Sequence, residues 1–485
     1  MKRALSRKNL WEALPHPVKT TVGRALGRLP LGLLLGRRFR RQLRFVRRAD
    51  SWSPEEIRAY QCAELARILR LAYDRTPFYR ELLEKAGFRP EDLRTPEDLS
   101  GLPTIDKNTV RSHLSEMYTI SPDTAGVDYV STGGTGGVPL QFYIGADRSA
   151  VEYAYLVTSW QRAGYRLGLP LAVFRGRVVP EDDHGLRHEY DPLLRQHYYS
   201  NFHMTDGNMA RYLEHVCGIG ECFLHGYPSS LAALARHLQR TNAEPPTNVR
   251  GMIAESEIVY PDQRGLIEST FRCRLFSCYG HTEKLVLAAE CERSTDCHVW
   301  PTYGYFELLD ENDRAVTTPG QRGEIVGTGF INAVVPFIRY RTGDYATYVG
   351  DHCQSCGRPH VLLRDIAGHR VQEYLVASDG AGISWTALNM HDNTFANVRQ
   401  FQFFQDAPGT AELRVIPAVG FGEADEDRIL RSLQRKFDGR LNFTIQLVES
   451  IPLSPMGKAI YVDQRIASAT PLSSESQVCA STSSL

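Results

Sequence analysis

The sequence lacks a long apolar segment and an excess of charge of either sign. The only continuous apolar run within residues 1–48, LPLGLLLG, is far shorter than the ~20 residues that a membrane-spanning helix needs. Arginines follow this run without an evident small-residue cleavage site, which argues against a cleaved signal peptide. Lysine plus arginine and aspartate plus glutamate number 56 each, so the whole chain has no net attraction for nucleic acid or membrane. These absences predict a cytoplasmic protein.

Signs of a disulfide framework, of internal repeats and of a DNA-binding module are also missing. Ten cysteines in 485 residues, without a secretory signal, are typical of reduced thiols or metal ligands. A hydrophobic content of 42% and a charged content of 23% are ordinary for a globular protein. The length predicts two or three domains.

Charge is uneven only at the N-terminus. Residues 1–48 contain fourteen lysines and arginines and a single acid, Glu12. One interpretation is a solvated basic helix that packs on the main domain. The other is a weak contact with an anionic membrane surface.

The chain divides by its patterns into helical, alternating and mixed regions. Residues 50–116 have helical spacing and open with a capping box from Ser53 to Glu56. Residues 127–350 alternate short β-rich and helical runs, which predicts an α/β fold with mostly parallel sheets. The strands then lose their helices, which predicts a β-rich subdomain. The predicted divisions are a helical segment 1–115, a core 116–364 with the β-rich part at about 300–364, a small mobile α+β domain 370–467, and a disordered Ser-rich tail 468–485.

A glycine-rich stretch, STGGTGGVP at 131–139, suggests a loop that approaches a ligand closely. It is neither a Walker A loop nor a G-x-G-x-x-G turn. Bare backbone N–H groups and Ser or Thr hydroxyls suit an oligophosphate. A flexible linker or a hairpin turn is the alternative.

Four further segments follow in order: YGHTE at 279–283, RYRTGD at 339–344, LLRDIAGHR at 362–370 and PLSPMGKAIY at 452–461. Together with the glycine loop they resemble the adenylate-forming superfamily, and within it the phenylacetate–CoA ligase family, especially its branch associated with capsular-polysaccharide clusters. The resemblance covers about residues 10–465. It implies the two-domain fold of that superfamily and an AMP-forming ligase.

The resemblance also implies the reaction and its participants. ATP and a carboxylic acid would give an acyl-AMP and pyrophosphate, with Mg²⁺ neutralising the phosphates, and CoA would then take the acyl group. An amine or sugar acceptor, or transfer of AMP to a phenol-like acceptor, is the alternative. A non-catalytic nucleotide-binding partner is a third hypothesis. The expected oligomeric state is a monomer or homodimer, with no nucleic acid partner.

Residue roles follow from the same resemblance. Tyr279 corresponds to the ring that stacks on adenine, Thr282 to the contact with the α-phosphate, and Glu283 to the Mg²⁺ ligand. Asp344 corresponds to the acid that accepts both ribose hydroxyls, which suits a carboxylate because each oxygen can accept one O–H. The full set of expected nucleotide-binding residues is Ser131, Thr132, Gly133, Gly134, Thr135, Gly136, Gly137, Ala254, Glu255, Ser256, Tyr279, Gly280, Asp344 and Arg364.

The expected catalytic lysine is Lys458 in SPMGK. By resemblance it reaches from the small domain to the attacking carboxylate and the α-phosphate, and its charge offsets their repulsion. Arg364 matches an arginine beside the interdomain hinge, which falls within 365–373. Asp365 and Glu373 are both candidates for the hinge acid.

Two cysteine segments suggest a metal site. Cys353 and Cys356 have the spacing of a zinc knuckle, and CERSTDCH supplies Cys291 with either Cys297 or His298. We expect a closed, structural Zn²⁺ site formed by Cys291, His298, Cys353 and Cys356. Reduced buried thiols without a metal are the alternative.

Overall fold

The computed structural model describes residues 26, 29–132, 140–177, 179–182, 185–367, 374–384, 388, 390, 394–395, 397–452 and 460–466. The predicted Ser-rich tail, 468–485, lies outside these residues.

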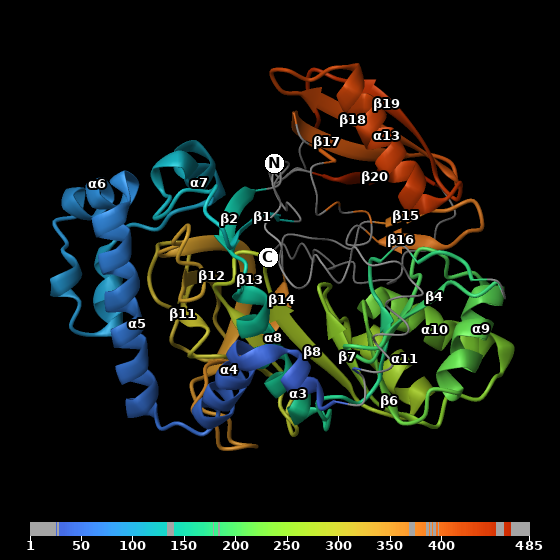
Figure 1. Ribbon diagram of the computed structural model, residues 1–485, viewed down its shortest axis with the longest axis horizontal. Coiled ribbons are helices and arrows are strands. Elements are labelled where there is room, and N and C mark those ends of the chain that lie inside the picture. The colour runs from blue at the N-terminus through green and yellow to red at the C-terminus, as the bar shows by residue number, and fades with distance from the viewer. Residues whose placement is uncertain are drawn as a thin grey trace, which may run out of the picture.

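The described part of the chain begins with helices that pack beside the main sheet (Figure 1). The first of them are α3 (Leu31–Leu34), α4 (Gly36–Ala49), α5 (Pro54–Arg75), α6 (Pro77–Lys85) and α7 (Lys107–His113), with the 3₁₀ turns η1 (Pro90–Asp92), η2 (Pro96–Gly101) and η3 (Leu114–Glu116). The predicted capping box is confirmed, because the Ser53 side chain accepts from the Glu56 N–H and the Glu56 carboxylate accepts from the Ser53 N–H.

Helix α4 explains the basic N-terminal stretch. Phe39, Leu43 and Val46 are buried in one apolar cluster with residues of α8 (Arg148–Arg162), whereas the arginines lie on the other side. The helix is therefore amphipathic and packs on the main domain, as the first interpretation predicts. Among the described residues, no helix has the length and apolar character needed to cross a bilayer.

One twelve-stranded mixed sheet forms the centre of the molecule. Its strands lie in the order β11 (Gly304–Leu309), β12 (Arg322–Gly329), β13 (Tyr340–Gly350), β14 (Leu362–Ala367), β10 (Cys297–Val299), β9 (Leu287–Ala289), β8 (Leu275–Gly280), β7 (Val249–Glu255), β6 (Cys222–Gly226), β3 (Leu171–Phe174), β5 (Gln196–Tyr199) and β4 (His188–Asp191). Parallel pairing is confined to the run β5-β3-β6-β7-β8.

Helices cover the parallel strands because each connects one strand to the next. They are α9 (Asp206–Cys217), α10 (Pro228–Thr241) and α11 (Pro261–Phe271), and their apolar faces share a core with β3, β6, β7 and β8. The strands from β9 to β14 have no connecting helices and pair antiparallel. The share of parallel strands is thus smaller than predicted, and the β-rich part continues the main sheet.

A short hairpin lies beside this sheet. It consists of β1 (Val127–Ser131) and β2 (Gln141–Gly145), and its buried Phe142 and Ile144 join the core formed by α5, α6 and the antiparallel strands. The predicted glycine loop connects these two strands.

The C-terminal residues form a separate small sheet with one helix, above the main sheet in Figure 1. Strands β17 (Val398–Gln405), β18 (Thr410–Pro417), β19 (Asn442–Leu447) and β20 (Val462–Gln464) lie in the order β19-β18-β17-β20, covered by α13 (Glu423–Phe437). A two-stranded sheet of β15 (Tyr374–Val376) and β16 (Gly382–Ser384) joins the same core. The prediction of an α/β fold with a small α+β C-terminal part is confirmed.

Candidate active site

The predicted nucleotide-binding segments meet at one edge of the sheet. Strands β7 and β8 are parallel neighbours, with Ala254 opposite Ser277 and Glu255 opposite Cys278. Their carboxyl ends therefore lie together, which is where ligands bind in open α/β sheets. The turn that carries Thr282 and Glu283 follows β8 directly.

Asp344 reaches this edge through a bulge in β13. Arg341 pairs with Val326 and Tyr345 pairs with Glu324. Three residues of β13, 342–344, therefore lie opposite a single residue of β12, Ile325. Gly343 has a φ of 75°, which few side chains tolerate, and its N–H donates to Glu324. The glycine of R-T-G-D is thus required by the backbone that projects Asp344.

Tyr279 and Asp344 are in direct contact. The Tyr279 hydroxyl donates a 2.8 Å hydrogen bond to Oδ2 of Asp344. Burial raises the pKa of Tyr279 well above its ordinary value, and the charge of Asp344 raises it further, so the phenol stays protonated. The two residues assigned to adenine and ribose therefore come together from positions 65 apart in the sequence.

Glu283 is buried beside them. Its carboxylate lies 3.4 Å from the Tyr340 hydroxyl and 3.3 Å from Nδ1 of His281. Nε2 of His281 accepts from the Val286 N–H, so the proton of the neutral ring is on Nδ1. Nδ1 faces Glu283, but the alignment is too poor for a hydrogen bond. Burial tends to raise the pKa of Glu283, but His281 and the charge of Lys107 lower it, so the group is a carboxylate ready for a cation.

Two cationic residues of α7, Lys107 and Arg111, lie near Glu283. The sequence motifs did not predict either of them as a site residue. Lys107 lowers the pKa of Glu283, and Arg111 interacts electrostatically with both Tyr340 and Tyr461. Tyr461 belongs to the C-terminal part of the chain, so this part lies within electrostatic reach of Arg111 on α7. The signal in the sequence was the L-P-x-x-x-K segment that ends at Lys107.

The ends of the glycine loop are described, but its centre is not. The Thr132 N–H donates to the Leu140 carbonyl at 2.8 Å, and the Leu140 N–H donates to Oγ1 of Thr132 at 3.0 Å. Ser131 and Thr132 are buried. The loop thus connects two strands that are paired up to its ends, and the predicted residues Gly133, Gly134, Thr135, Gly136 and Gly137 lie outside the described residues.

A buried ionic network lies next to the predicted adenine pocket. The Glu255 carboxylate accepts from Arg175 at 2.8 Å and from the Trp160 indole at 3.2 Å, and lies 3.4 Å from Nε2 of His225. Arg175 also donates to the Ser256 hydroxyl. Burial tends to raise the pKa of Glu255, but His225 and Arg175 lower it to about 2. Glu255 therefore fixes the strand ends, and its oxygens are already occupied by protein donors.

Arg364 does not face this site. Its guanidinium makes two hydrogen bonds to Asp296, of 2.7 and 3.1 Å, on the exposed side of β14. The next residue, Asp365, has a φ of 50°, an unusual backbone conformation for a non-glycine residue just before the predicted hinge. Lys458 and residues 368–373 lie outside the described residues.

A separate cavity of about 720 Å³ contains none of the predicted site residues. It lies beside α6 and is lined partly by Phe78, Leu102, His113 and Arg339.

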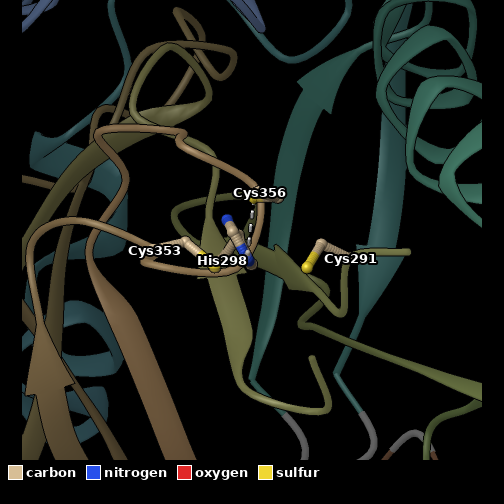
Figure 2. A group of neighbouring side chains, drawn as sticks. All are labelled: Cys291, His298, Cys353 and Cys356. Carbon is tan, nitrogen blue, oxygen red and sulfur yellow. Dashed lines mark hydrogen bonds between the residues drawn. The ribbon is translucent and has the colours of Figure 1, made fainter. Parts of the chain in front are cut away.

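The four predicted metal ligands lie together. One ligand atom each from Cys291, His298, Cys353 and Cys356 falls within 4.8 Å of the others. Figure 2 shows these four side chains gathered in one place. Nε2 of His298 is 3.9 Å from the Cys356 sulfur, which is near the spacing of roughly 3.5 Å expected for two ligands on one tetrahedral zinc. Nδ1 of His298 is buried without a hydrogen-bond partner. The residues fit a closed zinc site.

Strand geometry separates His298 from Cys297. Both are in β10, where successive side chains point to opposite faces. Cys297 lies in the main apolar core, while His298 faces the two knuckle cysteines. Cys297 is thus not placed with the other candidate ligands.

Comparisons with known proteins agree with this fold. Residues 375–465 match the family model of the CapK C-terminal domain. Protein CapK of Staphylococcus aureus is 22% identical over 79% of this chain and 83% of its own length. Phenylacetate-coenzyme A ligase of Thermus thermophilus is 25% identical over 66% of this chain and 72% of its own length.

A solved structure has the same fold. A crystal structure of 2-hydroxyisobutyryl-CoA ligase in the postadenylation state aligns with a TM-score of 0.54 and 21% identity over 86% of this chain and 91% of that protein. The fold is therefore that of adenylate-forming CoA ligases. Homologues of this chain include CapK and phenylacetate–CoA ligases, which confirms the predicted resemblance.

Proposed function

We propose that this protein is an AMP-forming ligase that activates a carboxylic acid with ATP, releases pyrophosphate and transfers the acyl group to CoA. The observation that carries the proposal is the meeting of Tyr279, Glu283 and Asp344 at the carboxyl edge of β7 and β8. The phenylacetate–CoA ligase homologues support the same reaction.

Each residue has a task that its surroundings allow. Asp344 accepts the ribose hydroxyls, and the Tyr279 ring supports the adenine. Thr282 donates to the α-phosphate, and Ser131 and Thr132 donate to the phosphates at the base of the glycine loop. Mg²⁺ would neutralise the phosphate oxygens, and Glu283 is the residue that would hold it.

The glycine-rich stretch of this chain contains no lysine: Val138 stands where the adenylate-forming superfamily that it resembles usually has one. Lys107 and Arg111 support the proposal because they bring positive charge to the vicinity of Glu283 and Tyr340. They would offset part of the charge of the leaving pyrophosphate.

Lys458 is proposed as the catalytic cation, delivered by the C-terminal part of the chain. Tyr461, three residues later, interacts with Arg111 and thus supports an approach of this segment to the site. The ammonium would stabilise the charge that develops between the attacking carboxylate and the α-phosphate. Rotation of the C-terminal part would then open the site to the acyl acceptor.

The acceptor of the acyl group has two candidates, CoA and an amine or sugar. An amine or sugar acceptor is the second candidate, because such nucleophiles can also take the acyl group once the acyl-adenylate has formed. Purified acyl-adenylate offered to the enzyme with CoA, an amine or a sugar would separate these acceptors by the product formed.

Acid-dependent ATP–pyrophosphate exchange tests the first half-reaction. Across a panel of aryl and alkyl acids, we expect exchange in the wild type and a loss of at least ~100-fold in Lys458→Ala, with ATP binding retained. Lys85→Ala, an exposed lysine paired with Glu81, is the matched control. Equal exchange in Lys458→Ala and the control would refute the role of Lys458.

A further inference from the structure

Three histidines outside the proposed active site converge at the far edge of the sheet. His188 is in β4, His197 in β5 and His215 in the last turn of α9, and one ring nitrogen from each falls within 4.8 Å of the others. All three are half-buried. No cysteine belongs to this group, so it differs in chemistry from the Cys/His site.

Strand register explains the convergence. His188 is opposite Tyr199 and Tyr190 is opposite His197, so both histidines point to one face of the β4–β5 hairpin. Helix α9 lies on this face, since the Tyr199 hydroxyl is 2.7 Å from Nδ1 of His215. The three imidazoles thus come from three elements that only the folded chain brings together.

Two of the nitrogens are spaced as metal ligands are. Nε2 of His188 and Nδ1 of His197 share a hydrogen bond of 3.0 Å, a separation close to the roughly 3.3 Å between two imidazole nitrogens on one tetrahedral zinc, so a cation would take the place of the shared proton. Nδ1 of His215 is engaged by Tyr199, which leaves Nε2 for a metal and fixes the ring orientation. Such a hydroxyl can accept the Nδ1 proton when Nε2 is a ligand.

Neutral imidazole is the form that binds metals, and the half-buried position of all three rings disfavours their charged form.

We propose that His188, His197 and His215 form a second metal site, which binds a divalent transition cation of the Zn²⁺ type, with water as the fourth ligand. Imidazole is a good ligand for zinc, copper, cobalt and nickel, and three imidazoles with one further position suit a tetrahedral ion. The site would join the terminal strand β4 to α9.

This position gives the metal a structural consequence. Arg187, which precedes β4, donates a 2.8 Å hydrogen bond to Asp438 of the C-terminal part. Phe202, which follows β5, packs edge-on against Phe437 at a ring distance of 5.6 Å. A metal that holds the β4–β5 hairpin on α9 would thereby steady the surface on which the C-terminal part rests.

Cobalt titration of tag-free, metal-stripped protein tests the proposal. We expect about two Co²⁺ per chain, one at each site. The ion at the Cys/His site should show the strong near-ultraviolet absorption of thiolate ligands, and the ion at the three histidines should not. His197→Gln should lose only the second. His113→Gln, which alters a histidine paired with Glu116 far from the cluster, should keep both.

A conservative variant guards against loss of folding. Tyr199→Phe retains all three imidazoles but removes the hydroxyl next to His215, and should weaken the second Co²⁺ by about 10–100-fold. Two results would overturn the proposal. One is that all bound Co²⁺ carries thiolate absorption; the other is that His197→Gln binds as much thiolate-free Co²⁺ as wild type.

Discussion

Glu255→Gln should reveal how much the buried network at the strand ends contributes to stability. Glu255 is 8% exposed, and its pKa falls from an ordinary 4.5 to about 2 because His225 and Arg175 outweigh its burial. At about 1.4 kcal/mol per pH unit, this difference corresponds to about 3 kcal/mol of stability. The variant keeps the shape of the side chain but leaves Arg175 without its carboxylate, which has a cost of similar size.

The pH dependence gives this prediction its sign. A carboxylate whose pKa is lowered by folding contributes fully above about 4.5, and the contribution is lost as the pH falls towards 2. The difference between wild type and Glu255→Gln should therefore be constant from pH 7 to about 5 and shrink below pH 4.5.

Urea unfolding followed by tryptophan fluorescence measures the difference, and Trp160 is a reporter within the network. Glu81→Gln, an exposed glutamate paired with Lys85, is the matched control and should change stability by less than ~0.5 kcal/mol. A Glu255→Gln effect no larger than that of the control, or one that persists unchanged at pH 3, would refute the reasoning.

Three further predictions concern the proposed site and the Cys/His cluster. Asp344→Asn removes the charge that accepts the ribose hydroxyls and should raise the KM for ATP about 10–100-fold in the exchange assay, with a smaller effect on kcat; an unchanged KM would exclude the ribose contact. Lys107→Ala should lower exchange about tenfold while Lys85→Ala does not, because only Lys107 acts on Glu283; equal rates would remove Lys107 from the site. Cys353→Ser should reduce zinc, measured by elemental analysis, by about one per chain and lower the unfolding temperature; an unchanged zinc content would argue against the knuckle.

Much of the architecture follows from local patterns. The Ser53–Glu56 capping box and the alternation of strands and helices between β3 and β8 were predictable because they depend on neighbours in the sequence. The antiparallel end of the sheet was harder, since strand order depends on contacts between distant segments. The strands from β9 to β14 therefore extend the main sheet in a way that composition did not indicate.

Within the candidate site, too, some residues were predictable from the sequence and others were not. Motifs predicted Tyr279, Glu283 and Asp344 as site residues, and the contact between Tyr279 and Asp344 follows from the β13 bulge. Arg175 and His225 were missed because their partner, Glu255, lies on another strand. A polar residue at the end of an apolar strand, as in LAVFR and CFLHG, was the available signal.

Two other outcomes have simple geometric causes. The choice of His298 over Cys297 follows from the alternation of side chains in β10. In the aromatic stretch HYYSNFHM at 197–204, Tyr199 stacks on Phe174 and Phe202 packs edge-on against Phe437, so packing accounts for these two rings.

The most direct test of the central claim is a crystal structure with a non-hydrolysable acyl-AMP analogue. We predict the adenine on the Tyr279 ring, both ribose hydroxyls on Asp344, and the Lys458 ammonium beside the group that replaces the α-phosphate. An analogue bound away from Tyr279 and Asp344, or a Lys458 that stays remote from it, would contradict the account.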